Sequence, residues 1–319
     1  MQGLELCRRF FFEVGLPEIQ KQLPELLPHL AAGLSGGSQC HGNDDEQSRD
    51  HDWGPGFIVW LDDVAFHRFN QPLHAMLDTL PQEYLGYGWQ KVTAAQKSCT
   101  IAEIKAFMRA KIGVVRRPDD DATWLTIPEE QLFELSHTAI FYDAPAEITN
   151  RIQSFANYPE EIWKNRMVKA LRELWQWKVR HIERAMKRKD VITAQLLWGK
   201  FCEHAMKAGF LLNHEYAPYD KWRYVQFLKL PEFGQEVGTW ISSGLNDANQ
   251  MVDAAQKIQS LYTQKLYAMG FTPAEMPDSG YEDMELQAYA VAIYTTIQNS
   301  EIRADLALSP FGRRSIPAN

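Results

Sequence analysis

The spacing of apolar residues changes near Ala146, and this change constrains the fold more than any other feature of the sequence. Before it, stretches with the three-to-four spacing of helices alternate with short apolar stretches typical of strands. After it, helical spacing persists at residues 162–187, 191–214, 248–269 and 283–307. This order predicts an α+β protein, in which an N-terminal α/β domain with a small mixed sheet (residues 1–147) precedes an all-helical domain (residues 148–319).

The N-terminal half divides into short elements. Residues 4–30 have helical spacing, and Pro17, Pro24 and Pro28 predict that they form two helical pieces. We expect strands at 29–34 and 56–62, a polar loop at 39–49, and helices at 64–80 and 102–111. Residues 88–101 fit one or two strands, and residues 132–142 fit either a helix followed by a strand or a single element.

Composition argues against some classes of partner. The net charge of −8 disfavours nonspecific binding to nucleic acid, and the basic residues at 178–189 are typical of a solvated helix face. No apolar stretch approaches the length of a membrane span, and the first residues lack the basic and apolar regions of a signal peptide. The four cysteines lack the spacing of a disulfide framework and fit reduced thiols. We therefore expect a cytoplasmic protein.

Two short motifs indicate chemistry. Gly36-Gly37-Ser38 predicts a turn whose backbone approaches a phosphate closely, because glycine has no side chain in the way. Asp50-His51-Asp52 precedes an apolar stretch, and on a strand its two aspartates would share one face. Paired carboxylates are what Mg²⁺ takes from a protein when nucleotide phosphates complete its shell. Asp50 and Asp52 are therefore the predicted metal ligands, and two Mg²⁺ ions are compatible with them.

The two motifs together resemble the signature of the polymerase-beta-type nucleotidyltransferases. A closer resemblance is to a poorly characterised bacterial branch of that superfamily, a family built on a domain of unknown function. It carries stretches like Asp44-Asp45-Glu46 and Ser48-Arg49-Asp50-His51-Asp52-Trp53-Gly54-Pro55, and later one like Tyr216-Ala217-Pro218-Tyr219-Asp220-Lys221-Trp222. Both stretches are present in the expected order, and the resemblance runs from about residue 3 to about residue 235.

The resemblance implies an enzyme that moves a nucleoside monophosphate, above all AMP, from a nucleoside triphosphate to a hydroxyl of an unidentified small-molecule or protein acceptor. Gly37 and Ser38 would bind phosphates, and Arg49 would either neutralise phosphate charge or form a surface salt bridge. In the helical domain, Glu215 and Asp220 are the candidates for a base that deprotonates the acceptor, and Lys221 is a predicted nucleotide contact.

One departure from the superfamily pattern leaves alternatives open. Members usually carry a third carboxylate on the strand after the aspartate-bearing strand and its helix, yet residues 87–101 contain no acidic residue. Glu103 follows just after, on the expected helix. The chain could instead be a weakly active or inactive nucleotide-binding regulatory protein on the same scaffold, or an antitoxin-like partner of another protein. The oligomeric state is not assigned.

Overall fold

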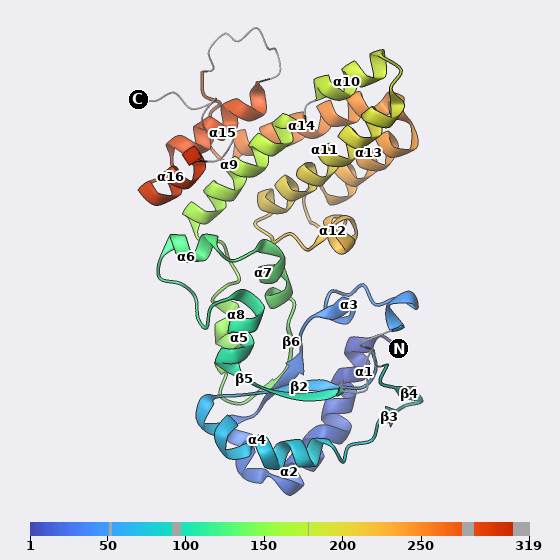
Figure 1. The fold of residues 1–319 in the computed structure, drawn as a ribbon, viewed down its shortest axis with the longest axis vertical. Helices are drawn as coiled ribbons and strands as arrows, with labels where there is room; N and C mark the ends of the chain where they lie inside the picture. Colours follow the sequence, from blue (N-terminus) through green and yellow to red (C-terminus); the bar gives the residue numbers. More distant parts are fainter. Residues whose placement is uncertain (51–52, 91–96, 178, 276–283, 309–319) are drawn as a thin grey trace. The chain divides into compact units, whose positions relative to one another are not determined.

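The chain folds into two compact units, which we call the sheet unit and the helical unit (Figure 1). The computed structural model describes residues 1–50, 53–90, 97–177, 179–275 and 284–308. The sheet unit comprises Met1–Asp119 and Ile127–Ala156, and the helical unit comprises Asp120–Thr126 and Asn157–Asn319. Helices and a small mixed sheet together make this an α+β protein, as the sequence predicts.

The sheet unit alternates helices and short strands. Its elements are α1 (Gly3–Phe10), the π-helical turn η1 (Phe11–Gly15), α2 (Leu16–Gln22), the 3₁₀ helix η2 (Pro24–His29), β1 (Ala31–Leu34), α3 (Gly37–Cys40), the 3₁₀ turn η3 (Gln47–Arg49), β2 (Phe57–Leu61), α4 (Asp63–Leu77), β3 (Glu83–Tyr84), β4 (Tyr87–Gly88), β5 (Cys99–Glu103), α5 (Ile104–Ile112), α7 (Glu129–Ser136), β6 (Ala139–Asp143) and α8 (Glu147–Gln153). For residues 132–142, the structure selects the alternative of a helix followed by a strand.

The main sheet has the strand order β5-β2-β1-β6. β1 runs antiparallel to both of its neighbours, with Gly33 opposite Ile58 of β2 and Ile140 of β6. β5 runs parallel to β2, with Phe57 opposite Cys99. Consequently β1 ends, and β2, β5 and β6 all begin, at the same end of the sheet, which we call the turn end.

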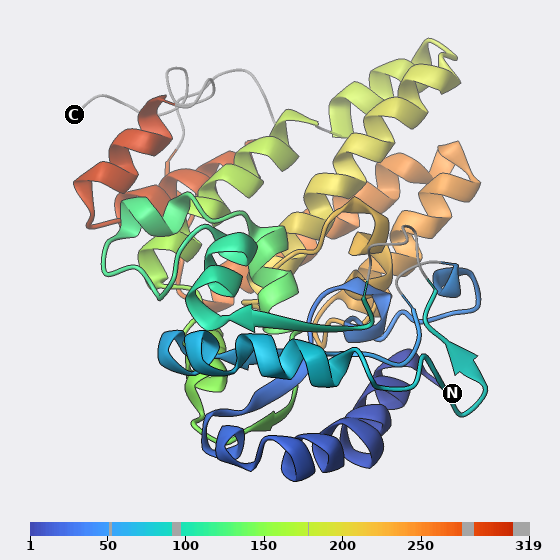
Figure 2. The same cartoon turned by 60° about the horizontal axis from the view of Figure 1, so that its bottom comes forward.

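Successive side chains along a strand point to opposite faces, so the apolar side chains are divided between the two faces of the sheet. In β2, Phe57, Val59 and Leu61 join the core formed with α1, α2 and α4. Trp60 points to the other face, where its ring packs edge-on against Phe107 of α5 at 5.3 Å between centroids. Helices therefore cover both faces, with α1, α2 and α4 on one side and α5, α7 and α8 on the other (Figures 1 and 2).

The N-terminal helical segment differs from its predicted form at Pro17. The chain stays helical through this proline, because the π-helical turn Phe11–Gly15 precedes it and Pro17 occupies the first turn of α2. A proline lacks an N–H and crowds the carbonyl four residues earlier, and a widened turn relieves that crowding. The helix breaks instead at Leu23, before Pro24.

All described elements of the helical unit are helices. They are α6 (Asp121–Leu125), α9 (Glu160–Gln176), α10 (Val179–Lys187), α11 (Val191–Leu212), α12 (Asp220–Phe227), α13 (Gly234–Asn246), the 3₁₀ turn η4 (Ala248–Gln250), α14 (Met251–Ala268), α15 (Glu285–Thr295) and α16 (Ser300–Leu308). α9 packs against α6, α11, α15 and α16, and α14 packs against α10, α11, α13 and α15. Two predicted long helices, 162–187 and 283–307, are each two helices in the structure.

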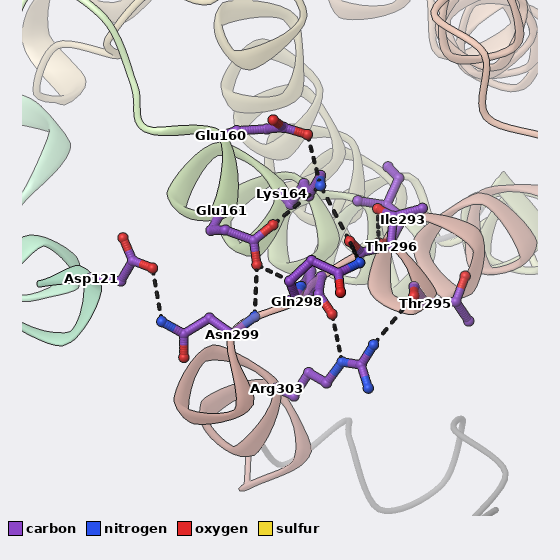
Figure 3. Close-up of polar contacts among 11 residues, drawn as sticks. Asp121, Glu160, Glu161, Lys164, Ile293, Thr295, Thr296, Gln298, Asn299 and Arg303 are labelled. Carbon is purple, nitrogen blue, oxygen red and sulfur yellow. Dashed lines mark hydrogen bonds and ion pairs between the residues drawn. The ribbon is translucent and has the colours of Figure 1, made fainter.

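A carboxylate on α9 explains why the second of those predicted helices is divided. Glu161 accepts hydrogen bonds from the backbone N–H groups of Gln298 (2.7 Å) and Asn299 (2.9 Å), between α15 and α16 (Figure 3). The side chain of Asn299 accepts from the backbone N–H of Glu301, which caps the start of α16. Backbone groups that a continuous helix would pair are thus paired by side chains.

The four cysteines are free and buried. Burial raises the pKa of the Cys7, Cys40 and Cys99 thiols to about 12, so these side chains behave as small apolar groups. Within the described ranges, no helix combines the length and apolar character needed to cross a lipid bilayer.

Candidate functional site

The glycine motif lies at the turn end, directly after β1. Gly36 (φ 83°) and Gly37 (φ 78°) both adopt the left-handed backbone conformation that favours glycine. Residues 37–40 form the short helix α3, which corrects the predicted loop from residue 39 onward. Gly37 is exposed, and a Cβ atom placed on it would meet no described atom within 4 Å. This backbone is therefore accessible to a ligand.

The aspartate motif reaches the same end of the sheet from the other direction. Because β1 and β2 are antiparallel, the chain leaves β1 through the glycine motif and returns to β2 at the turn end. Asp50 is exposed and follows the 3₁₀ turn η3 in a helical backbone conformation, seven residues before β2 begins at Phe57. The prediction that Asp50 lies on a strand is wrong, because the β2 ladder starts later. His51 and Asp52 lie outside the described residues.

The acidic residues just before Asp50 hold their own loop together. Asp44 accepts a hydrogen bond from the indole N–H of Trp53 (2.9 Å) and another from the backbone N–H of Gly3. Asp45 accepts from both the backbone N–H and the hydroxyl of Ser48, each at 2.8 Å. These carboxylates therefore have structural partners, and Asp44 ties the loop that precedes Asp50 to α1.

Arg49 packs against the same loop. Its guanidinium carbon lies 4.9 Å from the centre of the Trp53 ring, and the side chain donates to the carbonyl of Met1 at 3.3 Å. Stacking on an aromatic ring orients a guanidinium group without neutralising its charge. Nucleotide binding by Arg49 and Ser38 stays a prediction.

An ionic cluster of one buried and two partly exposed residues, which the sequence analysis missed, lies beside the glycine motif. The imidazole Nε2 of His41 is 2.9 Å from a carboxylate oxygen of Glu134 on α7, and the side chain of His41 is 1% exposed. The ammonium of Lys111, on the last turn of α5, is 3.9 Å from the other carboxylate oxygen. A Cβ atom on Gly36 would lie 3.4 Å from that oxygen. The three residues come from separate elements, and only the sheet topology brings them together.

The charge state of Glu134 follows from its neighbours. Burial raises the pKa of this carboxyl group, but the hydrogen bond with His41 and the electrostatic interactions with His41, Lys111 and His137 lower it by more, so the pKa lies below its usual value. Glu134 is therefore ionised at neutral pH.

This lowered pKa predicts how the cluster responds to acid. A carboxylate with a lower pKa in the folded state stabilises the fold above its unfolded pKa, about 4.3, and that stabilisation is lost as the pH falls toward the folded value. We expect wild type to be more stable than Glu134→Gln at pH 7, with a difference that shrinks below about pH 4.3. Urea unfolding at several pH values measures this, and a difference independent of pH would contradict it.

Glu103, the acidic residue that follows residues 87–101, lies at the opposite end of the sheet from Asp50. Glu103 is the last residue of β5, where its carboxylate caps α5 by accepting from the backbone N–H groups of Lys105 (3.0 Å) and Ala106 (2.8 Å). Cys99 begins β5 at the turn end, so Glu103 is four residues, or roughly 13 Å, further along the strand. It is not positioned to act as a third carboxylate beside Asp50.

The remaining predicted site residues belong to the helical unit. Partial burial raises the pKa of Glu215, which follows α11. Asp220 begins α12, and its carboxylate pairs with Arg223 at 2.6 Å. Lys221 is exposed, with its ammonium 4.9 Å from the centre of the Trp222 ring. Their roles as base or nucleotide contact stay predictions.

Part of the chain matches a known family model. Residues 124–223 match the domain of unknown function DUF4037. The matched segment contains Glu134 and the Tyr216–Trp222 stretch, and it excludes the glycine and aspartate motifs. It agrees with the expected likeness to a domain of unknown function and provides no link to the nucleotidyltransferases. No curated protein matches the chain.

Proposed function

We propose that this protein is a Mg²⁺-dependent nucleotidyltransferase that moves a nucleoside monophosphate, above all AMP, from a nucleoside triphosphate to a hydroxyl group of a small-molecule or protein acceptor. One observation carries the proposal: the antiparallel pairing of β1 and β2 brings the glycine motif and the Asp50 segment to the same end of one sheet. An accessible backbone turn and a carboxylate at the same end of one sheet are what a nucleotide with its metal ion requires.

Asp50 lies at the turn end, and we propose that its carboxylate and that of Asp52 hold Mg²⁺. Carboxylate oxygens are hard ligands of the kind this ion takes. Asp44 and Asp45 already accept hydrogen bonds from Trp53, Gly3 and Ser48, so the neighbouring acids are engaged elsewhere. When bound, the ion would neutralise phosphate charge and lower the pKa of the attacking hydroxyl. Gly37 and Ser38 would orient the phosphates, which favours the reaction through positioning.

A second candidate function is nucleotide binding with little or no turnover. Glu103, the acid closest in sequence to the expected third position, lies at the opposite end of the sheet. This arrangement favours a regulatory protein that binds a nucleotide through Asp50, Asp52 and the glycine motif.

Two measurements test the proposal. Calorimetry measures binding of ATP, GTP, CTP and UTP with and without Mg²⁺, and an α-labelled nucleotide measures transfer of the nucleoside monophosphate to an acceptor. Asp50→Asn and Asp52→Asn should each abolish the Mg²⁺-dependent part of binding. Losing several kcal/mol of charge stabilisation should lower the transfer rate by roughly 100-fold or more. Binding of nucleotide without transfer would favour the second candidate.

Asp63→Asn is the matched control. Asp63 begins α4 just after β2 ends, so it is an exposed aspartate at the opposite end of the sheet. The Asp63→Asn variant should bind nucleotide like wild type. Full activity in both Asp50→Asn and Asp52→Asn would overturn the proposal, as would the absence of Mg²⁺-dependent binding for all four nucleotides.

A further inference from the structure

The ammonium group of Lys111 lies close to the point where a side chain on Gly36 would begin. A Cβ atom built on Gly36 would lie 3.1 Å from Nζ of Lys111, which is tighter than most contacts of real Cβ atoms. The absence of that atom lets a positive charge approach the backbone of the glycine motif. Lys111 reaches it from the last turn of α5, because β5 and α5 together carry the chain away from the turn end and back.

Lys111 is held loosely. Its Nζ atom is 3.9 Å from Glu134, beyond hydrogen-bond distance, and it donates no hydrogen bond to any residue in the described ranges. The side chain is 27% exposed. Lysine has three donors on a flexible stem, so this ammonium retains donors for a ligand.

The carboxylate of Glu134 has a partner other than Lys111. Its other oxygen is 2.9 Å from His41, whose side chain is almost completely buried and therefore fixed in place. If the lysine moved toward a ligand, the carboxylate would keep this contact. The His41–Glu134 pair thus leaves Lys111 able to change partners.

We propose that Lys111 binds a phosphate group of the nucleotide at the Gly36–Gly37 turn. This inference rests on the proposed function and names a binding residue that lies outside both sequence motifs. No described atom lies within 4 Å of a Cβ placed on Gly37, and Lys111 supplies a positive charge beside the preceding residue, Gly36, on a protein with net charge −8. A mobile cation beside an exposed backbone turn attracts an anion and repels a free metal ion, so a phosphate is the ligand that this position fits.

Calorimetry with Mg²⁺–ATP and with inorganic tripolyphosphate tests the inference. Charge-assisted hydrogen bonds contribute about 1.5–3 kcal/mol, so Lys111→Gln should weaken binding of both ligands by roughly 10- to 100-fold. Lys111→Arg, which keeps the charge, should recover much of the loss. A purely structural lysine would lower the unfolding midpoint and would leave the affinity of the folded protein unchanged.

Lys105→Gln is the matched control, because Lys105 is an exposed lysine at the other end of α5. It should bind both ligands like wild type. If wild type binds ATP and Lys111→Gln binds it equally well, the inference is overturned and the proposed function stands. If wild type binds tripolyphosphate through Lys111 but does not bind ATP, the proposed function fails and the phosphate site stands. Absence of binding to either ligand overturns both.

Discussion

Replacing Gly33 by alanine is expected to destabilise the sheet unit by about 3 kcal/mol or more, at the upper end of what overpacking costs. Gly33 is buried in β1, an inner strand of the sheet. A Cβ atom there would lie 2.1 Å from the backbone carbonyl oxygen of Ala139 and 2.9 Å from the ring of Trp60. A side chain could rotate away, but a backbone carbonyl moves only if β6 moves with it.

Moving β6 would disturb the candidate site as well as the sheet. The pairing of β1 with β6 already shifts register between Ala32 and Gly33. The hydroxyl groups of Ser35 and Thr138, 2.9 Å apart, connect the glycine motif to the start of β6. Each ladder hydrogen bond that is lost costs about 1 kcal/mol, which adds to the steric penalty. We therefore expect Gly33→Ala to weaken phosphate binding as well as stability.

Hydrogen–deuterium exchange, read from peptides of β1 and β6, measures this effect separately from the helical unit. Gly88→Ala is the control in the same unit, since its nearest neighbour would be at an ordinary 3.9 Å. Gly199→Ala, on an open position of α11, should stabilise the helical unit by roughly 0.5–1 kcal/mol. Unchanged exchange in Gly33→Ala would contradict the proposed clash.

Trp163→Ala is expected to destabilise the helical unit by about 3–5 kcal/mol. Trp163 lies on α9 and is 4% exposed. Its ring stacks on His214 after α11 and on Phe271 after α14, with centroids 5.2 Å and 6.0 Å away. One side chain therefore connects three helical segments, and its removal would leave a cavity between them.

Trp163→Phe separates the packing from the hydrogen bond. The indole N–H donates to the carbonyl of Leu211 at 2.8 Å, and that carbonyl also accepts from the backbone N–H of His214 at 3.0 Å. Phenylalanine keeps a ring in the stack but loses this donor and the second ring of the indole, so the expected cost is about 1–3 kcal/mol, below that of alanine. Urea unfolding combined with exchange in peptides of α9 and α11 reports both variants. Equal losses for the two would show that the hydrogen bond dominates.

Local patterns in the sequence predict the elements of this fold better than their ends. Apolar spacing predicts β1, β2 and α4 to within a few residues, because each buries one face in the same core. It does not predict the break between α15 and α16, which depends on a distant carboxylate, Glu161. Helical spacing alone continues across such a break. Apolar spacing likewise does not predict the π-helical turn before Pro17.

For the candidate site too, the sequence predicts local motifs but not contacts between distant residues. The glycine and aspartate motifs are local, and residue chemistry alone identifies them. His41, Glu134 and Lys111 lie far apart in the sequence, and none of them belongs to a recognisable motif. Their meeting requires the strand order and the return of α5 to the turn end. A lysine near the end of a helix gives no local signal for a binding role.

The path of the chain has a consequence for how these units can be exchanged or separated. The chain enters the helical unit at Asp120, returns to the sheet unit at Ile127 and leaves it again after Ala156. In the short segment Asp120–Thr126, α6 buries Trp124, which is 1% exposed. Asp121 of the same helix accepts a hydrogen bond from Asn299 at 2.8 Å. No single cut separates two complete units, because gene fusion or recombination at any one of the three junctions leaves at least one product with part of the other unit. Fragments split after Ala156 should instead remain associated through α6, which makes this junction suited to split-protein complementation.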